Sequence, residues 1–450
     1  MTANNSLEAF IPMRRTDIIN LCIDDGKLNQ EQATVFREVC EMITAFYHFR
    51  FHQSLELFKD NYLVFDPHAE IQPYIEPELD QYEQMKANIF RAFESVLART
   101  NYRKLSIEKI KHALDKKSLI NLKTEIDFDD FEDLYCYYRG NTTKTINQKK
   151  YFFWNSEKQI DVFERIVLLI GFKGKGYFEA KNSGKKKKDE LNFTPGKIYL
   201  YFYKNIPQLD IDLLFPNLKS SMTLKDKLLF GIPAIGAAIP LLLKTLPNLL
   251  VVFVAILFAL NLRDPSLIQS IDVDHNKARN IMPVLVATLS LGMAFGGFAM
   301  QQYNQYKSKQ VKFQKNVTDT LFFKNLANHS SAFQLLVDIA EEEECKEIIL
   351  AYYHLLTSPQ PLTPQQLDSK IEQWMEEKAQ IKINFDIQGP LQNLAEIRGK
   401  IANHSNDKPD QSLIPLLSYD AHGYCQVLPL TQTRALIDYV WDHIFEYAEC

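Results

Sequence analysis

The chain has 450 residues, of which 46% are hydrophobic and 24% charged, and its formal net charge is −5. These averages are ordinary for globular domains, and the net charge gives no sign of general nucleic-acid binding. The six cysteines are scattered without CxxC spacing, which argues against a disulfide scaffold and predicts free thiols in a reducing compartment. The first residues lack an apolar stretch, so we expect no cleaved secretory signal.

Residues 1–115 are predicted to form a helical domain. The stretch 28–62 contains no Gly or Pro and has apolar residues at helical spacing, and 82–102 has the pattern of a further amphipathic helix. His48 and His52 stand at i, i+4, a spacing that suits a metal pair. No third ligand is spaced to complete a site, so we interpret them as part of an aromatic-rich helix face.

Residues 116–226 are predicted to form a small β-rich α/β domain. The stretches 162–181 and 196–206 are rich in Val, Ile, Tyr and Phe, and 131–141 is either a strand or a short helix. We expect GFKGKG at 171–176 to be a hairpin rather than a phosphate loop. The link at 182–196 is expected to be an exposed loop carrying four consecutive lysines. The candidate contacts for anionic lipid headgroups are Lys185, Lys186, Lys187 and Lys188. The simpler interpretation is a solvated loop.

Residues 227–303 are predicted to be a transmembrane region, with spans inside 228–262 and 281–302. The first stretch holds one charge in 35 residues and is interrupted at 244–248 by a lysine and a proline. Gly292 and Gly296 have a spacing that lets helices approach closely. Lysines on both outer flanks favour two crossings, with both termini cytosolic; three crossings remain an alternative.

The rest of the chain is predicted to form a helical stalk at 304–360 and a winged-helix-like domain at 361–450. The stalk is one long helix or two helices broken near Asn328. Its acidic run, Glu341–Glu344, is interpreted as a solvated face in preference to a cation site or general acid. Thr363 begins a helix as a hydroxyl cap followed by proline, and the order helix, helix, helix, hairpin follows. Because the last unit is acidic, we expect it to contact protein or to be structural.

Several segments resemble one known family, in the same order along nearly the whole chain. They are FIPMRRTDIINLC (10–22), YYRG (137–140), FERIVLL (163–169), YKNIPQLDIDLLFPN (203–217) and FFKNLANHSSAFQLLVDIAEEEECKEIILAYYHL (322–355). The chain therefore resembles the transmembrane protein 143-like family, whose members contain a domain of unknown function. The resemblance implies membrane insertion through a central apolar pair. It implies no activity, so no functional residues are carried over.

Together these patterns predict an α+β membrane protein with a helical amino-terminal part, a small β-rich part, a two-span hairpin and a helical carboxy-terminal part. No catalytic motif is present, which favours a protein that is not an enzyme but leaves the question open. No cofactor is expected. We expect a non-enzymatic, membrane-anchored scaffold. Its partners would be membrane lipids and a protein or a second copy, not nucleic acid. The alternative is an oligomeric transporter or channel-like protein built from the broken first span. The expected location is the bacterial inner membrane.

Overall fold

The computed structural model describes residues 9–71, 73–75, 77–115, 123–151, 154–183, 191–221, 321–401 and 413–446, and individual helical positions between 290 and 319. The chain forms two compact units. Unit 1 contains Met1–Lys109, Phe128–Gln208 and Lys324–Cys450, and unit 2 contains Ile110–Asp127 and Leu209–Phe323. The five-domain division expected from the sequence remains a prediction.

Helices α2 (Gln30–Tyr62) and α9 (Pro364–Ala379) of unit 1 begin at capping residues that the sequence supplies. The other α-helices that lie within unit 1 are α1 (Arg15–Asp24), α3 (Leu79–Ala98), α5 (Lys175–Asn182), α8 (His329–Leu356), α10 (Gln388–Glu396) and α11 (Leu430–Asp442). Asn29 and Gln32 form a reciprocal capping box at the start of α2. Thr363 and Gln366 do the same for α9, with Pro364 in the first turn, so the predicted helix start is confirmed. The two long amino-terminal helices are also confirmed.

An antiparallel five-stranded sheet forms the other half of unit 1, in the order β1-β3-β4-β5-β7. Its strands are β1 (Arg103–Lys104), β3 (Phe131–Tyr151), β4 (Trp154–Phe172), β5 (Ile198–Pro207) and β7 (Asn325–Asn328). The β-rich stretch predicted at 162–181 is a strand as far as Phe172 but helical in α5 from Lys175, the stretch predicted at 196–206 is confirmed by β5, and 131–141 is a strand. The expected hairpin at GFKGKG is wrong, because Gly174 is the amino-terminal cap of α5.

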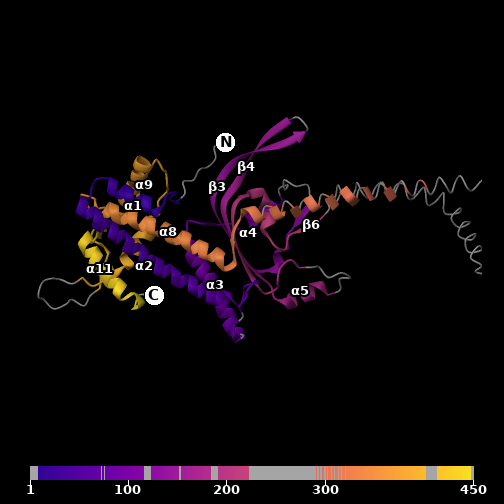
Figure 1. Cartoon of the computed structure of the whole chain (residues 1–450), viewed down its shortest axis with the longest axis horizontal. Coiled ribbons are helices and arrows are strands. Elements are labelled where there is room, and N and C mark those ends of the chain that lie inside the picture. Colours follow the sequence, from indigo (N-terminus) through magenta and orange to yellow (C-terminus); the bar gives the residue numbers. More distant parts are fainter. Residues whose placement is uncertain are drawn as a thin grey trace, which may run out of the picture. The chain divides into compact units, whose positions relative to one another are not determined.

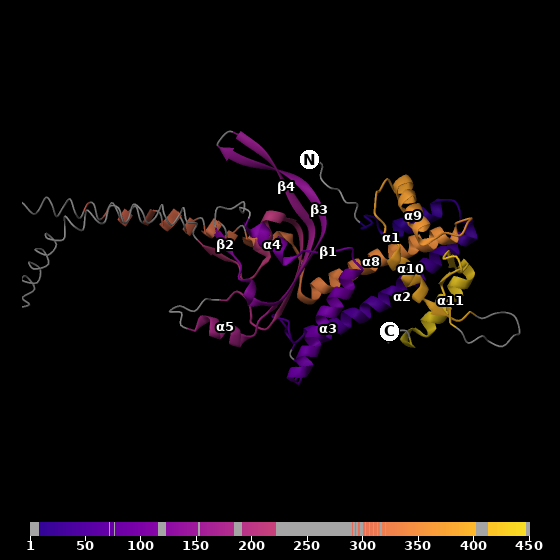
Figure 2. The same cartoon turned by 180° about the vertical axis from the view of Figure 1, so that it is seen from behind.

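Helices α2, α3 and α8 lie on one face of this sheet, with α5 on the other side, and α8 is central in the helical layer (Figures 1 and 2). Alternate sheet residues such as Val167, Leu200 and Phe202 enter the same apolar core as α2, α3 and α8. The helical break expected near Asn328 is observed: β7 ends there, and His329 begins α8 with a positive φ of 54°. The sheet and the helical layer therefore share a single core.

The carboxy-terminal part adds two short β-pairs. β8 (Arg398–Gly399) pairs with β9 (Ile414–Pro415), and β10 (Leu417–Tyr419) pairs with β11 (Cys425–Val427) before α11 and a 3₁₀ turn at Ile444–Glu446. Asp420 accepts backbone N–H bonds from His422 and Tyr424 in the β10–β11 turn. Whether this end is a winged helix stays a prediction.

Unit 2 is described only in part. Strand β2 (Lys123–Glu125) pairs antiparallel with β6 (Lys219–Ser221), next to a 3₁₀ segment at Gln208–Leu214. The Asn217 amide donates to the Asp127 carbonyl at 2.8 Å, and buried Leu213 packs with Leu218 and Val317. Helix α4 (Ile107–Asp115) begins in unit 1 and continues into unit 2.

The predicted membrane architecture is corrected. In the part of the chain that the structure describes, no helix is both long enough and apolar enough to cross a bilayer. The chain is a mixed α/β protein with an antiparallel sheet, and the expected inner-membrane location, with both termini cytosolic, is corrected with it. The two apolar segments themselves, 228–262 and most of 281–302, lie outside the described residues.

Gly140 on β3 is a position where a side chain has no room. Its φ is +71°, and an added Cβ would lie 2.6–2.7 Å from Cβ, Cγ and Oε2 of Glu164 on β4. We expect Gly140→Ala to lower the free energy of unfolding by about 1–3 kcal/mol, measured by urea denaturation. The control, Gly176→Ala in α5, has open space around it and should change stability by at most about 1 kcal/mol. Equal effects of the two changes would contradict the steric argument.

Candidate functional site

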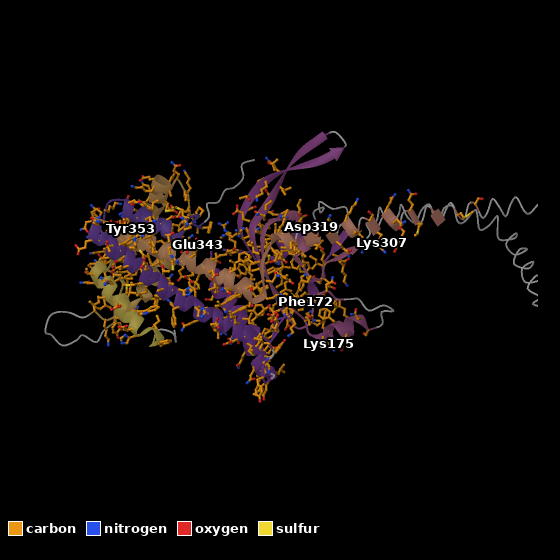
Figure 3. All side chains as sticks on the ribbon, viewed as in Figure 1. Phe172, Lys175, Lys307, Asp319, Glu343 and Tyr353 are labelled. Carbon is orange, nitrogen blue, oxygen red and sulfur yellow. The ribbon has the colours of Figure 1, made fainter. Side chains whose placement is uncertain are left out.

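The acidic run of α8 is buried rather than solvated. Glu343 and Glu344 are 2% and 3% exposed, and Lys346 is 2% exposed, because α8 is surrounded by α1, α2, α3, α9, α10 and the sheet. Figure 3 shows Glu343 and Tyr353 among the crowded side chains of this layer. The interpretation of the run as a solvated face is therefore wrong for these residues. A charge in such a position must be paired and hydrogen-bonded to be tolerated.

The segment Phe10–Arg15, here called the strap, supplies part of that pairing. Lys346 Nζ donates to the carbonyl oxygens of Ile11 at 2.7 Å and Met13 at 3.2 Å, and lies 2.6 Å from Glu343 Oε1. The Ile11 N–H donates to Glu343 Oε2 at 3.2 Å. The Arg15 N–H donates to Glu342 Oε1 at 2.7 Å, while its guanidinium lies 3.4 Å from the same carboxylate. The buried ion pair thus anchors the strap.

Two further glutamates of α8 meet α3 and the turn after it. Arg99 Nη1 lies 3.4 Å from Glu344, and the Asn101 amide donates to Glu347 Oε1 at 3.2 Å. Burial raises the pKa of Glu344 despite Arg99. Burial also raises the pKa of Glu347 to about 8, so this side chain holds its proton at neutral pH.

A pocket of about 710 Å³ opens between the strap, α8 and the sheet. Its polar lining contains four cationic side chains and four acidic ones. The residues that line it are Phe10, Ile11, Pro12, Met13, Arg14, Asp17, Arg139, Arg165, Asp338, Ile339, Glu342, Glu343 and Lys346. All of them belong to unit 1.

Two of the cations come from directly opposed positions in the sheet. Arg139 on β3 is the antiparallel partner of Arg165 on β4, and Arg165 is the partner of Lys204 on β5. Opposed residues project from the same face, so these three form a cationic row. The preceding row on this face, Tyr137, Val167 and Phe202, belongs to or packs against the apolar core. On this face of the sheet, apolar side chains are therefore followed by cationic ones where the strands reach the pocket.

Among the described residues, the cations of this row have no salt-bridge partner, whereas most other charged residues in and beside the pocket do. Arg14 pairs with Asp17, Lys346 with Glu343 and Arg15 with Glu342.

Among the described residues, neither Arg139 nor Arg165 has an acidic partner within salt-bridge distance. Arg139 lies 3.9 Å above the Phe10 ring and 5.2 Å from the Tyr102 ring, and its Nη1 is buried without a hydrogen-bond partner in this part of the chain. The remaining acid, Asp338, has a pKa raised by partial burial and by Glu341. The pocket thus has unused guanidinium donors.

A second polar cluster surrounds His329. Tyr62 has one hydroxyl proton, and its oxygen lies 2.7 Å from the Ile198 carbonyl oxygen, which can only accept, and 3.0 Å from His329 Nδ1. Nδ1 must therefore carry the proton in this contact, which leaves Nε2 as an acceptor. Burial lowers the pKa of His329, which keeps the ring neutral. No group of three or more His, Cys, Asp or Glu in the described residues is arranged to hold a metal ion.

Of the residues predicted from sequence as site residues, those that the structure describes lie outside both the pocket and the His329 cluster. Lys185, Lys186, Lys187, Lys188 and Gly292 lie outside the described residues. Gly296 is helical and exposed. His48 and His52 stack with ring centroids 6.3 Å apart, and His48 Nδ1 lies 2.9 Å from Glu341.

The sequence analysis missed Arg139 and Arg165 as site residues, although both lie in segments quoted for the family resemblance. The sequence did contain one indication. In YYRG and FERIVLL, an arginine occupies a position that the alternation of the strand would place on the apolar, core-facing side. The sequence does not show which residues of the two strands lie opposite each other, so it could not show that the two arginines are neighbours.

Comparison with known proteins adds one match. A family model described as "Protein of unknown function (DUF3754)" matches residues 163–331, which is under half of the chain. The match includes Arg165, Lys204 and His329 but neither the strap nor Arg139. The expectation of a domain of unknown function is confirmed, whereas the match gives no support to the transmembrane protein 143-like family, and that assignment is corrected. No solved structure matches the chain.

The proton on Glu347 predicts a pH-dependent stability. Between pH 4.5, the ordinary value for a glutamate, and about 8, the folded chain keeps a proton that the unfolded chain has released. This group should therefore lower the free energy of unfolding as pH rises through that window, by up to about 1.4 kcal/mol per pH unit. Glu347→Gln keeps an acceptor for Asn101 and should reduce the slope, measured by urea denaturation from pH 5 to 8. Glu342→Gln, at a less buried position, is the control; an unchanged slope in Glu347→Gln would contradict the assignment.

The buried pair predicts a second effect. Lys346→Met leaves the Glu343 carboxylate and the strap carbonyls without their cation, so it should lower the free energy of unfolding by about 3–5 kcal/mol. The double variant Glu343→Leu with Lys346→Met removes both charges and should recover part of that loss. If the double variant is as unstable as the sum of the two single variants, lost packing rather than an unpaired charge is the cause.

Proposed function

We propose that unit 1 is a binding module for a small ligand that carries a phosphate group, which the pocket holds through Arg139 and Arg165. One observation carries the proposal: two guanidinium groups stand directly opposite each other across two strands, line one pocket and lack acidic partners in the described residues. Like charges in opposed positions destabilise a sheet. A dianion between them would convert that repulsion into charge-assisted, bidentate hydrogen bonds.

The surroundings support an anion rather than a cation. Three of the four acids that line the pocket are engaged by Arg14, Arg15 and Lys346, whereas Arg139 and Arg165 have no acidic partner among the described residues. The guanidinium of Arg139 lies over Phe10, and its buried Nη1 has no hydrogen-bond partner among the described residues, so its donor capacity is not used within this part of the protein. The pocket volume is in the range of small-molecule sites.

The earlier functional hypotheses are corrected. Both the membrane-anchored scaffold and the oligomeric transporter require membrane spans, and the helices that the structure describes supply none. Neither hypothesis is carried forward.

Calorimetric titration with inorganic phosphate tests the proposal, with acetate as a monoanionic comparator. We expect phosphate to bind more tightly than acetate, and Arg139→Met or Arg165→Met to weaken phosphate binding at least about tenfold. Arg91→Met on the exposed face of α3 is the control and should leave binding unchanged.

A stability measurement distinguishes a binding role from a structural one. Without phosphate, Arg165→Met should raise the free energy of unfolding by a few tenths to about 1 kcal/mol, because one of two opposed like charges is gone. A destabilised variant, or phosphate binding equal to that of the unmodified chain, would overturn the proposal.

A further inference from the structure

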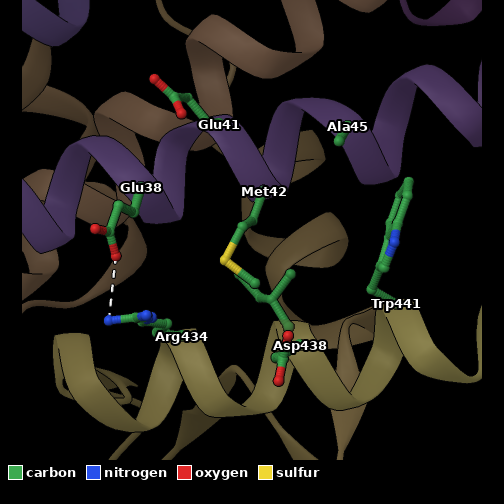
Figure 4. A pocket seen from close by; sticks show the side chains of 8 residues that line it. Glu38, Glu41, Met42, Ala45, Arg434, Asp438 and Trp441 are labelled. Carbon is green, nitrogen blue, oxygen red and sulfur yellow. Dashed lines mark ion pairs between the residues drawn. The ribbon is translucent and has the colours of Figure 1, made fainter.

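A groove separate from the pocket lies between α2 and α11, with a volume of about 460 Å³ (Figure 4). Met42, Ala45 and Ile437 provide its apolar lining, and Trp441, which is 47% exposed, stands at one end. Beyond Trp441, Phe445 is 77% exposed and packs edge-on against Phe49, with ring centroids 5.9 Å apart. Large apolar side chains on a surface helix, exposed to this degree and close together, are typical of an interaction site.

The rim of the groove is acidic. Glu38 is neutralised by Arg434, whose Nη1 lies 3.2 Å away, as the dashed line in Figure 4 shows. Glu41 and Asp438 are exposed and have no salt-bridge partner among the described residues. The groove therefore combines an apolar floor and an aromatic wall with two unpaired carboxylates, which suits a cationic amphipathic helix.

The chain itself carries such a helix. The described positions at 303–305, 307–308, 310–312 and 314–315 are helical, and Tyr303, Lys307, Val311 and Lys315 are exposed at successive i, i+4 spacings. These four side chains therefore share one face, with apolar Val311, which is 56% exposed, between two lysines. Lys307 and Lys315 are about 12 Å apart along the axis. This face complements the groove in both polarity and charge.

We propose that the groove on α2 and α11 docks the Tyr303–Lys315 helix of a second copy of the chain. Val311 would cover the apolar floor, while Lys307 and Lys315 would approach Glu41 and Asp438. Each copy carries both surfaces, so two copies can exchange helices reciprocally and close as a symmetric dimer. The contact does not involve the anion pocket.

Sedimentation equilibrium of the full chain tests this inference. We expect self-association that weakens between about 0.05 and 0.5 M salt, because exposed charges are screened. Glu41→Lys with Asp438→Lys should weaken association at least about tenfold, and so should Lys307→Glu with Lys315→Glu. Asp60→Lys, elsewhere on α2, is the control and should associate like the unmodified chain.

Mixing the two charge-reversed variants provides the decisive measurement. Each variant repels itself, since its groove and its helix have the same sign, but each groove complements the helix of the other variant. The mixture should therefore recover association that neither variant shows alone. An unmodified chain that stays monomeric at about 100 μM, unaltered association after reversal, or a mixture that fails to associate would overturn the inference. Helix docking within one copy would give the first of these outcomes.

Discussion

The ion pair between Glu343 and Lys346 is the constraint on which the architecture of unit 1 depends. Helix α8 is enclosed by other elements along most of its length, so Glu343 and Lys346 are removed from water. An isolated charge there would be strongly destabilising, and the pair alone leaves hydrogen-bonding capacity unused. The strap satisfies that capacity with two backbone carbonyls and one backbone N–H. The strap is therefore held against a helix more than 300 positions later in the chain.

This arrangement also shapes the pocket. The strap places Phe10 under the guanidinium of Arg139, while the acids of α8 are turned toward Lys346 and Arg15. As a result the positive charge of the sheet is not cancelled by the acidic run next to it. The buried network that stabilises the helical layer thus pairs the acids Glu342 and Glu343 with Arg15 and Lys346. It leaves Arg139 and Arg165 without an acidic partner among the described residues. These two guanidinium groups can therefore bind an anion.

The docking surface on α2 and α11 differs from the pocket in the exposure and pairing of its charged residues. Trp441, Glu41 and Asp438 are exposed, the floor is apolar, and these two rim carboxylates have no salt-bridge partner among the described residues. Such a surface gains from association through burial of Trp441 and its neighbours, while the rim carboxylates select the sign of the partner. The pocket and the groove are lined by different residues, so their proposed ligands do not compete.

Local patterns in the sequence determined much of this protein. The capping residues Asn29 and Thr363, the uninterrupted apolar spacing of α2, and the β-branched runs of β4 and β5 each specify an element through interactions within a few residues. Tertiary structure decided the rest. Glu343 and Glu344 look solvated in sequence because consecutive glutamates point in different directions around a helix, and only the enclosure of α8 on all sides buries them. Arg139 and Arg165 are 26 positions apart, and the register of β3 against β4 makes them one site. Burial and strand register both depend on contacts between segments far apart in the chain, and no local pattern contains them.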